Sequence, residues 1–298
     1  MSDLKKYLDD CCAAVEKTLD EVMPKATDYP QKIHEIMRYS TFAGGKRIRP
    51  ALLFAANQAC GAEFANKNAC LAGAAIEMLH TFSLIHDDLP CMDNDDMRRG
   101  KPTCHKVFGE AVAVLAGDAL LTRAFEVMAD HGTMSAQDRV WIISNVAGRT
   151  GARGMIGGQV LDMLYEGGCR AVNLEDLRYM CSFKTGALMN IAVDIAMATC
   201  RPDSEKQTKI FNFTRNLGLA FQIRDDILDL IGDAESLGKN IGMDIERGKA
   251  TFVTVLGLEG AAELLEQLTN EAIAEISHFG DKAQFLIDLT NYLLNREN

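Results

Sequence analysis

The 298-residue sequence lacks any uninterrupted apolar run of about 18 residues, the length that a membrane-spanning helix needs. No membrane span is therefore expected, although 48% of the residues are apolar and suffice for a sizeable core. The first ten residues, MSDLKKYLDD, are charged and lack the apolar segment of a secretory signal. These absences predict a cytoplasmic protein.

Cysteine is present, but it lacks the spacing of a metal site or of a disulfide framework. The nine cysteines are an odd number, none of them forms a CxxC pair, and Cys11 directly precedes Cys12. Neither a zinc site nor a set of disulfides is indicated, so we expect reduced thiols.

An excess of positive charge is also lacking, because the net charge is −11 and the isoelectric point is near 5.1. Nucleic acid is therefore not an expected partner. A small anionic ligand is still compatible with this charge, because a local basic cluster or a bound cation reverses the potential of a single site. The sequence has no GxGxxG, P-loop or EF-hand pattern and no convincing Ser–His–Asp or Cys–His nucleophile.

Alternating strand patterns are missing, and the apolar periodicity is helical almost throughout. There is no repeat, no low-complexity segment and no Pro/Ser-rich linker. We expect one all-α domain over 1–298, with the longer helices around a central space. The expected helices cover residues 4–22, 31–42, 50–61, 66–89, 109–130, 135–165, 174–200, 206–232, 251–277 and 281–295.

Acidic residues are concentrated in the stretch HDDLPCMDNDDMRRG, residues 86–100. It contains five aspartates beside Arg98 and Arg99, and it follows the apolar helical pattern AIEMLHTFSLIH. A second cluster, FQIRDDILDLIGD, covers residues 221–233 and places Asp225 and Asp229 one helical turn apart. Carboxylates on apolar helices are costly to bury unless they are paired or bind a cation. Magnesium, which prefers oxygen ligands, fits both clusters better than a solvated acidic surface does.

Basic groups lie in separate short motifs. GGKRIRP, residues 44–50, places cations in a loop just before a helix, a favourable position for a phosphate. His80 precedes Asp87 by two helical turns and points toward the same expected site. Together the motifs indicate a site for two diphosphates, one bound through magnesium to aspartates and one bound directly by Lys, Arg and His. The expected chemistry is metal-assisted departure of a diphosphate.

In these motifs the sequence resembles the trans-isoprenyl diphosphate synthases, most closely the bacterial type of farnesyl diphosphate synthase. The resemblance extends from about residue 30 to the end of the chain. Its fold is an all-α bundle of the isoprenoid synthase type around a deep central cavity, usually in a homodimer. The matching motifs, in order, are GGKRIRP, EMLHTFSLIHDDLPCMDNDDMRRGKPTCH, GDALL, GGQVLD, KTG, FQIRDDILD, LGKN and GKATF.

The resemblance also implies roles for individual residues. The catalytic set would be Lys184 and two magnesium-binding motifs, Asp87, Asp88 and Asp93 in the first and Asp225, Asp226 and Asp229 in the second. By resemblance, three magnesium ions would hold the allylic diphosphate. Its further ligands would be Arg98, Lys184, Thr185, Gln222, Lys239 and Lys249, and the isopentenyl diphosphate ligands would be Lys46, Arg49, His80 and Arg99. Asp95 and Asp96 are expected to orient the arginines.

Product length is implied by the residues just before the first motif. Phe82 and Ser83 occupy the positions that often set the floor of the cavity in this family. A bulky Phe82 resembles farnesyl synthases, which condense isopentenyl diphosphate head-to-tail with dimethylallyl and geranyl diphosphates. The alternatives are a geranylgeranyl diphosphate synthase and a non-catalytic partner subunit of a prenyl synthase. A terpene cyclase would need no second diphosphate site, so GGKRIRP and His80 count against it.

Overall fold

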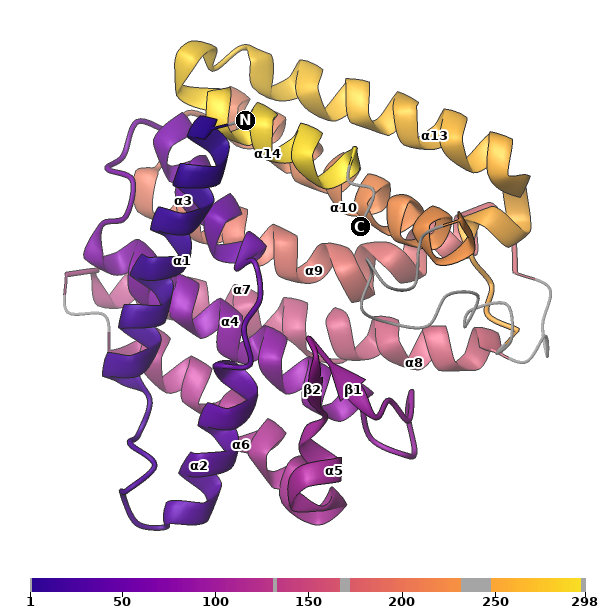
Figure 1. Cartoon of the computed structure of the whole chain (residues 1–298). Coiled ribbons are helices and arrows are strands. Elements are labelled where there is room, and N and C mark those ends of the chain that lie inside the picture. Colours follow the sequence, from indigo (N-terminus) through magenta and orange to yellow (C-terminus); the bar gives the residue numbers. More distant parts are fainter. Residues whose placement is uncertain (1, 131–132, 167–171, 232–247, 296–298) are drawn as a thin grey trace. The chain divides into compact units, whose positions relative to one another are not determined.

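Helices make up most of the computed structural model, which describes residues 2–130, 133–166, 172–231 and 248–295 (Figure 1). They belong to two compact units: residues 1–54 with 63–143, and residues 55–62 with 144–298. Helices α3 (Ile48–Ala59) and α7 (Ala136–Thr150) each begin in the first unit and end in the second.

The first unit has α4 (Lys67–Asp87) at its core, where it packs against α1 (Ser2–Val22) and α6 (Glu110–Ala129). The Asn66 side chain caps α4 by accepting a hydrogen bond from the backbone N–H of Ala69, at 3.0 Å. In length and composition α4 could cross a membrane, but 67% of its most apolar window is buried within the protein. A core helix has the same properties.

Shorter elements of the first unit surround the end of α4. They are α2 (Gln31–Thr41), the strands β1 (Met97–Arg98) and β2 (Lys101–Pro102), and α5 (Cys104–Phe108). The two strands form an antiparallel hairpin in which Arg98 pairs with Lys101. Tyr39 of α2 donates a hydrogen bond to the carbonyl oxygen of Pro102 at 2.8 Å, which fixes β2 to α2.

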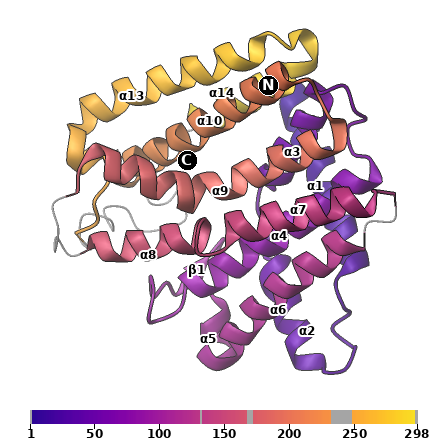
Figure 2. The same cartoon turned by 180° about the vertical axis from the view of Figure 1, so that it is seen from behind.

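The second unit is built on α10 (Ser204–Ile231), which packs along α9 (Leu174–Cys200) and α13 (Phe252–Ser277) (Figure 2). Helix α8 (Met155–Tyr165) lies against α9, and α14 (Gln284–Leu294), which follows the 3₁₀ turn Gly280–Ala283, packs on α13. The side chains of Asn173 and Thr251 cap α9 and α13 in capping boxes.

The expected all-α class is confirmed, and most expected helices lie within a few residues of the observed ones. The single helix expected over 135–165 is wrong: α7 ends at Thr150 and α8 begins at Met155. Gly154 between them has a non-helical backbone, and a Cβ at this position would lie 1.8 Å from the Arg149 carbonyl oxygen. Helix α3 starts at Ile48 rather than at Pro50, which is tolerated in a first turn because its missing N–H has no helical acceptor.

Candidate active site

The first aspartate motif lies where α4 ends and the chain doubles back. The backbone N–H of Asp93 donates to the carbonyl oxygen of Asp87 at 2.8 Å, and that of Asn94 donates to Leu89 at 3.1 Å. Asn94 has a φ of 53°, which a short polar residue tolerates better than most. This turn brings Asp93 back to Asp87, so the motif's spacing places both residues at one end of the helix.

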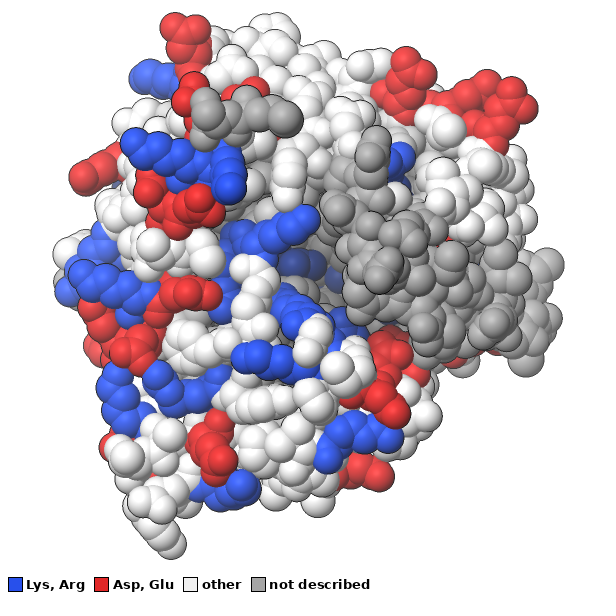
Figure 3. Space-filling model, in the orientation of Figure 1, with Lys and Arg blue, Asp and Glu red and all other residues white. Residues whose placement is uncertain are grey.

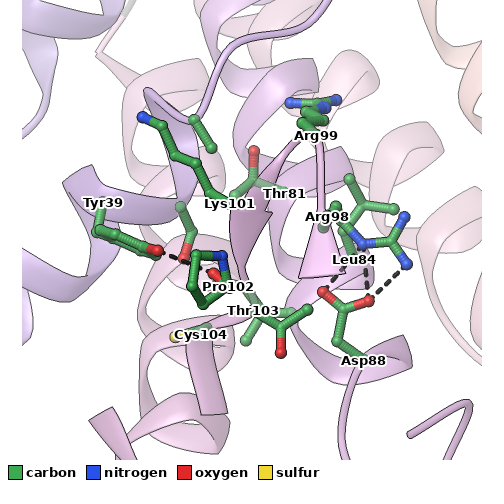
Figure 4. Close-up of a pocket in the computed structure, with 13 residues that line it drawn as sticks. Tyr39, Thr81, Leu84, Asp88, Arg98, Arg99, Lys101, Pro102, Thr103 and Cys104 are labelled. Atoms are coloured by element: carbon green, nitrogen blue, oxygen red, sulfur yellow. Dashed lines mark hydrogen bonds and ion pairs between the residues drawn. The ribbon is translucent and has the colours of Figure 1, made fainter. Parts of the chain in front are cut away.

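Asp88, in contrast, is 3% exposed and is held by Arg98. The Nε of Arg98 donates to both carboxylate oxygens, at 2.7 and 2.9 Å, while its Nη2 lies 2.5 Å from Oδ1 (Figure 4). Burial raises the pKa of the Asp88 carboxyl, and the hydrogen bonds from Arg98 oppose that rise. Arg98 also contacts Asp95 at 3.3 Å, as expected, whereas Asp96 pairs with Lys106 at 2.7 Å rather than with an arginine.

A second group of cations in the first unit gathers around His80. Arg99 points away from Asp88 (Figure 4). Its Nη1 donates to the carbonyl oxygen of Gly44, and its guanidinium carbon lies 2.7 Å from where a Cβ of Gly45 would stand. Burial, followed by the nearby charges of Arg49 and Arg99, lowers the pKa of His80 well below its usual value. The imidazole is therefore neutral at physiological pH.

The GGKRIRP loop divides its three basic residues between two roles. Arg47 is buried, with ion pairs to Glu77 at 2.9 Å and Glu16 at 3.2 Å, so it holds the loop to α4 and α1. Lys46 is exposed and Arg49 is partly exposed, on either side of Arg47. The loop thus offers Lys46 and Arg49, the two members predicted as ligands. In Figure 3 a group of Lys and Arg side chains lies over the region of the β1–β2 hairpin.

A cavity lies behind the hairpin, lined by Asp88, Arg98 and Arg99 together with residues of α2, α4 and β2 (Figure 4). Its volume is about 30 Å³, which is room for about two or three water molecules. It is too small for an isoprenoid diphosphate, so we assign it to packing under the hairpin.

In the second unit, the middle aspartate of the second motif connects three helices. Asp226 accepts a hydrogen bond from Gln222 Nε2 at 2.9 Å and one from the backbone N–H of Phe252 at 2.8 Å. Gln222 in turn accepts from the hydroxyl of Thr185 at 2.8 Å. The sequence predictions Thr185, Gln222 and Asp226 are therefore joined in one chain of hydrogen bonds from α9 through α10 to α13. Asp225 and Asp229 lie on the same helix, partly exposed and buried respectively.

The lysines of the second unit converge on a residue that sequence reasoning did not single out. Asp162 of α8 lies 2.5 Å from Lys184 Nζ and 3.8 Å from Lys249 Nζ, and Lys249 also pairs with Glu166 at 3.3 Å. Gly158 permits this, because a Cβ there would stand 2.4 Å from the backbone nitrogen of Lys184. The available signal was GGQVLD, in which Asp162 follows Gly158 by one turn. Lys239 lies outside the described residues.

Phe82 and Ser83, the predicted length-determining residues, lie on α4 with their side chains supported by neighbours. The Phe82 ring is 4% exposed and packs at 88° against the His86 ring, with centroids 5.5 Å apart. His86 is held by a hydrogen bond from its Nε2 to the Val114 carbonyl oxygen at 3.0 Å, beside Gly117 of α6. A Cβ at Gly117 would lie 2.2 Å from that Nε2, so the absence of a side chain there lets His86 support Phe82.

The carboxylates fit a magnesium ion that substrate oxygens and water complete. Among the described residues, no group of three or more His, Cys, Asp or Glu side chains is arranged to hold a metal by itself. Magnesium typically binds one or two carboxylates together with substrate phosphates and keeps several waters. Asp87 with Asp93, and Asp225 with Asp229, offer pairs of that kind.

A family model described as polyprenyl synthetase matches residues 30–286. The chain belongs to the polyprenyl synthetase family. As a member it is a prenyltransferase of isoprenoid biosynthesis, so the resemblance inferred from the motifs is confirmed.

Relatives and solved structures of polyprenyl synthetases resemble the chain over nearly its whole length. Geranylgeranyl pyrophosphate synthase 4 of Arabidopsis thaliana is 43% identical over 99% of this chain and 79% of its own. Farnesyl diphosphate synthase of Bacillus subtilis (strain 168) is 40% identical over 99% of both. The apo structure of an FPP/GFPP synthase from Zymomonas mobilis has a TM-score of 0.88 at 36% identity, covering 98% of this chain and 100% of that one.

Proposed function

We propose that this prenyltransferase is a magnesium-dependent farnesyl diphosphate synthase, which condenses isopentenyl diphosphate head-to-tail with dimethylallyl and geranyl diphosphates. One observation carries the proposal of two diphosphate sites. The consecutive residues Arg98 and Arg99 serve opposite sides of the hairpin, Arg98 at Asp88 and Arg99 at the GGKRIRP loop. The first unit thus has one cation beside the carboxylates and a separate group of cations around His80.

On the resemblance of the motifs to those of the family, we propose that the residues of both aspartate motifs serve the allylic diphosphate. Asp87, Asp88, Asp93, Asp225, Asp226 and Asp229 would hold magnesium, which when bound would supply positive charge against the leaving diphosphate as the allylic C–O bond breaks. Lys184 and Lys249 add positive charge, and Thr185 and Gln222 add hydrogen-bonding groups. Asp162, which both lysines contact in this structure, is a carboxylate that an anionic substrate would replace.

Isopentenyl diphosphate is bound by Lys46, Arg49, Arg99 and His80. The Nδ1 of His80 is buried and has no hydrogen-bond partner among the described residues. Because the ring is neutral, it adds a hydrogen-bonding group to a site whose positive charge comes from the arginines. The arginines orient the substrate so that its double bond attacks the allylic cation.

Product length is the finer part of the proposal, because relatives named for both products have similar identity to this chain. The farnesyl product is supported by the bulky Phe82, whose ring His86 holds in place. Geranylgeranyl diphosphate is the alternative product.

The decisive experiment incubates the purified protein with magnesium and isopentenyl diphosphate, and with each of dimethylallyl, geranyl and farnesyl diphosphates in turn. Chromatography of the dephosphorylated products then reports chain length. We expect farnesol from the first two primers and little elongation of the third. Geranylgeraniol as the main product would favour the alternative, and no product from any primer would favour a non-catalytic subunit. Omission of magnesium with excess chelator should abolish turnover.

Phe82→Ala is expected to lengthen the main product beyond farnesyl, because it removes the ring from the proposed floor. Gly117→Ala tests the support of that ring: its methyl group displaces His86, so a smaller shift toward longer products is expected. Thr122→Ala on α6 is the control, since it removes only an exposed hydroxyl that donates to the Asp118 carbonyl oxygen. Unchanged farnesyl output from Phe82→Ala would show that another residue forms the floor.

We further propose a cytoplasmic homodimer without nucleic acid partners. Helix α8 exposes an apolar stripe at helical spacing, formed by Ile156, Val160, Met163 and Leu164, each at least 42% exposed. Exposed apolar stripes of this kind mark association surfaces. Light scattering coupled to size exclusion should give twice the chain mass of 32.7 kDa, and Val160→Glu should shift that mass toward the monomer.

A further inference from the structure

Two cysteines outside the proposed active site meet where two helices end. Cys60 directly follows α3, whose last residue is Ala59, and Cys200 is the last residue of α9. Both belong to the second unit, and each thiol shifts the pKa of the other. Both residues are partly exposed.

The last turn of α3 fixes this arrangement through Asn57. The Sγ of Cys200 lies 3.5 Å from the side-chain oxygen of Asn57 and 3.9 Å from its backbone oxygen. Asn57 is one turn before Cys60, whose backbone N–H donates to Ala56 at 3.0 Å. The Asn57 amide nitrogen is buried without a hydrogen-bond partner among the described residues. Rotation of that amide would present the N–H group to a Cys200 thiolate.

The two thiols differ in acidity. The neighbouring Cys60 thiol lowers the pKa of Cys200 to about 7, while the neighbouring Cys200 and burial raise the pKa of Cys60. Such a pair has a nucleophilic member and a neighbouring thiol that can resolve it. The buried cysteines differ: burial raises the pKa of Cys11, to about 12, and also that of Cys104 and Cys181.

We propose that Cys60 and Cys200 form a reversible intramolecular disulfide when the protein meets a peroxide. The Cys200 thiolate attacks a peroxide oxygen, so an S–O bond forms, the O–O bond breaks, and the departing hydroxide takes up a proton to leave as water. Cys60 then loses its proton and attacks the resulting sulfenic acid, so the S–S bond forms, the S–O bond breaks, and a second water leaves. Two thiols are oxidised by two electrons, and hydrogen peroxide is reduced to two waters.

The disulfide would change the stability of the protein rather than its catalytic residues. Lys184 precedes Cys200 by 16 residues on α9, which corresponds to about 24 Å of helix. The link would connect the end of α3 to the end of α9 and close a long loop of chain. A link of this type restricts the unfolded chain, so we expect the melting temperature to rise by roughly 5 °C.

The test treats the folded, fully reduced protein with a few equivalents of hydrogen peroxide, alkylates the remaining thiols, and maps the unreduced peptides by mass spectrometry. The expected result is a peptide pair joined at Cys60 and Cys200, 2 Da lighter than the reduced pair and separated by dithiothreitol. The same treatment in concentrated urea should give a mixture of pairings, which would show that the native contact directs the bond.

Two variants and one control sharpen the result. Cys60→Ser should leave Cys200 as the over-oxidised sulfinic acid, and Cys200→Ser should leave Cys60 reduced, because its partner is the nucleophile. Cys91→Ser removes the exposed thiol and should form the link as the wild type does. A native protein in which Cys91 or other cysteines oxidise while the Cys60–Cys200 pair stays reduced would overturn the proposal. If the linked protein had the same melting temperature as the reduced protein, the proposed effect of the disulfide on stability would be wrong.

Discussion

The second aspartate of each motif, Asp88 in the first unit and Asp226 in the second, is buried, but the partners of the two carboxylates differ in kind. Asp88 is held by a guanidinium, a charged partner that is itself predicted to bind substrate. Asp226 is held by the Gln222 amide and by the first backbone N–H of α13. A helix N-terminus attracts negative charge without a cationic side chain.

This difference shows that the buried carboxylate of the same sequence motif can be stabilised in two ways, by a cationic side chain or by the N-terminus of a helix. In the first motif, the charge of Asp88 is balanced within a loop and a hairpin. In the second, the carboxylate fastens α10 to α13 and joins the hydrogen-bond chain from Thr185. The remaining aspartates of each motif, Asp87 and Asp93 or Asp225 and Asp229, are proposed as magnesium ligands beside them.

The largest effects are expected from the first aspartate of each motif. Asp87→Asn and Asp225→Asn should each lower kcat/KM by about 10²–10³-fold, because each removes a carboxylate proposed to hold the magnesium that would neutralise the leaving diphosphate. If both motifs serve one diphosphate, the double variant should lose much less than the product of the two single losses. Steady-state kinetics measure this, with exposed Asp281→Asn as the control. Fully multiplicative losses would indicate that the motifs act independently.

Substitution of the second aspartate of each motif, Asp88 or Asp226, should lower the free energy of unfolding by different amounts. Asp88→Asn leaves the guanidinium of Arg98 without its closest countercharge and should lower the free energy of unfolding by about 2 kcal/mol. Asp226→Asn keeps one acceptor for the Phe252 N–H and should lower it by about 1 kcal/mol. Urea titrations measure both.

A double-mutant cycle gives this contrast a second test. Asp88→Asn and Arg98→Gln should show a coupling of about 1 kcal/mol or more. A larger loss in Asp226→Asn than in Asp88→Asn would reverse the comparison of the two motifs.

His80 should give the first unit a pH dependence of stability. Its folded-state pKa lies well below the usual 6.5, so the unfolded chain binds a proton that the folded chain refuses. The stabilising contribution of the neutral ring is present above pH 6.5 and is lost as the pH falls below it, by at most about 1.4 kcal/mol per pH unit. Unfolding free energies at pH 7.5 and 5.5 should therefore differ less in His80→Gln than in the wild type. An equal difference in both proteins would show that His80 takes up its proton in the folded state.

The smallest effects should come from the outer aspartates of the first loop. Asp95 and its partner Arg98 are 38% and 31% exposed, and Asp96 pairs with an exposed lysine. Asp95→Asn and Asp96→Asn should each change the free energy of unfolding by less than about 1 kcal/mol. Asp95→Asn should have a modest effect on KM for the allylic substrate, because it loosens Arg98, whereas Asp96→Asn should have none.

Much of the fold followed from the sequence because apolar periodicity and helix caps are local. The ends of α4 and α9 could be predicted within two residues, since Asn66, Pro90 and the residues around Asn173 mark them. The break between α7 and α8 could not, because its cause is the approach of one backbone atom to another near Gly154. The motifs predicted which residues belong to the site, but not which side chains pair with each other, because those pairs form between different helices. Examples are the ion pair between Arg47 and Glu77 and the contacts of Lys184 and Lys249 with Asp162.

The hydrogen bond from the Phe252 N–H to Asp226 also has a consequence for folding during synthesis of the chain. The second motif is translated before α13, so the Asp226 carboxylate lacks this partner until the chain has extended past Thr251. A chain that stops short of Phe252 would carry every aspartate of both motifs, yet one buried charge would have lost the helix end that stabilises it. The start of α13 is thus part of the second motif, although no residue of the consensus lies there.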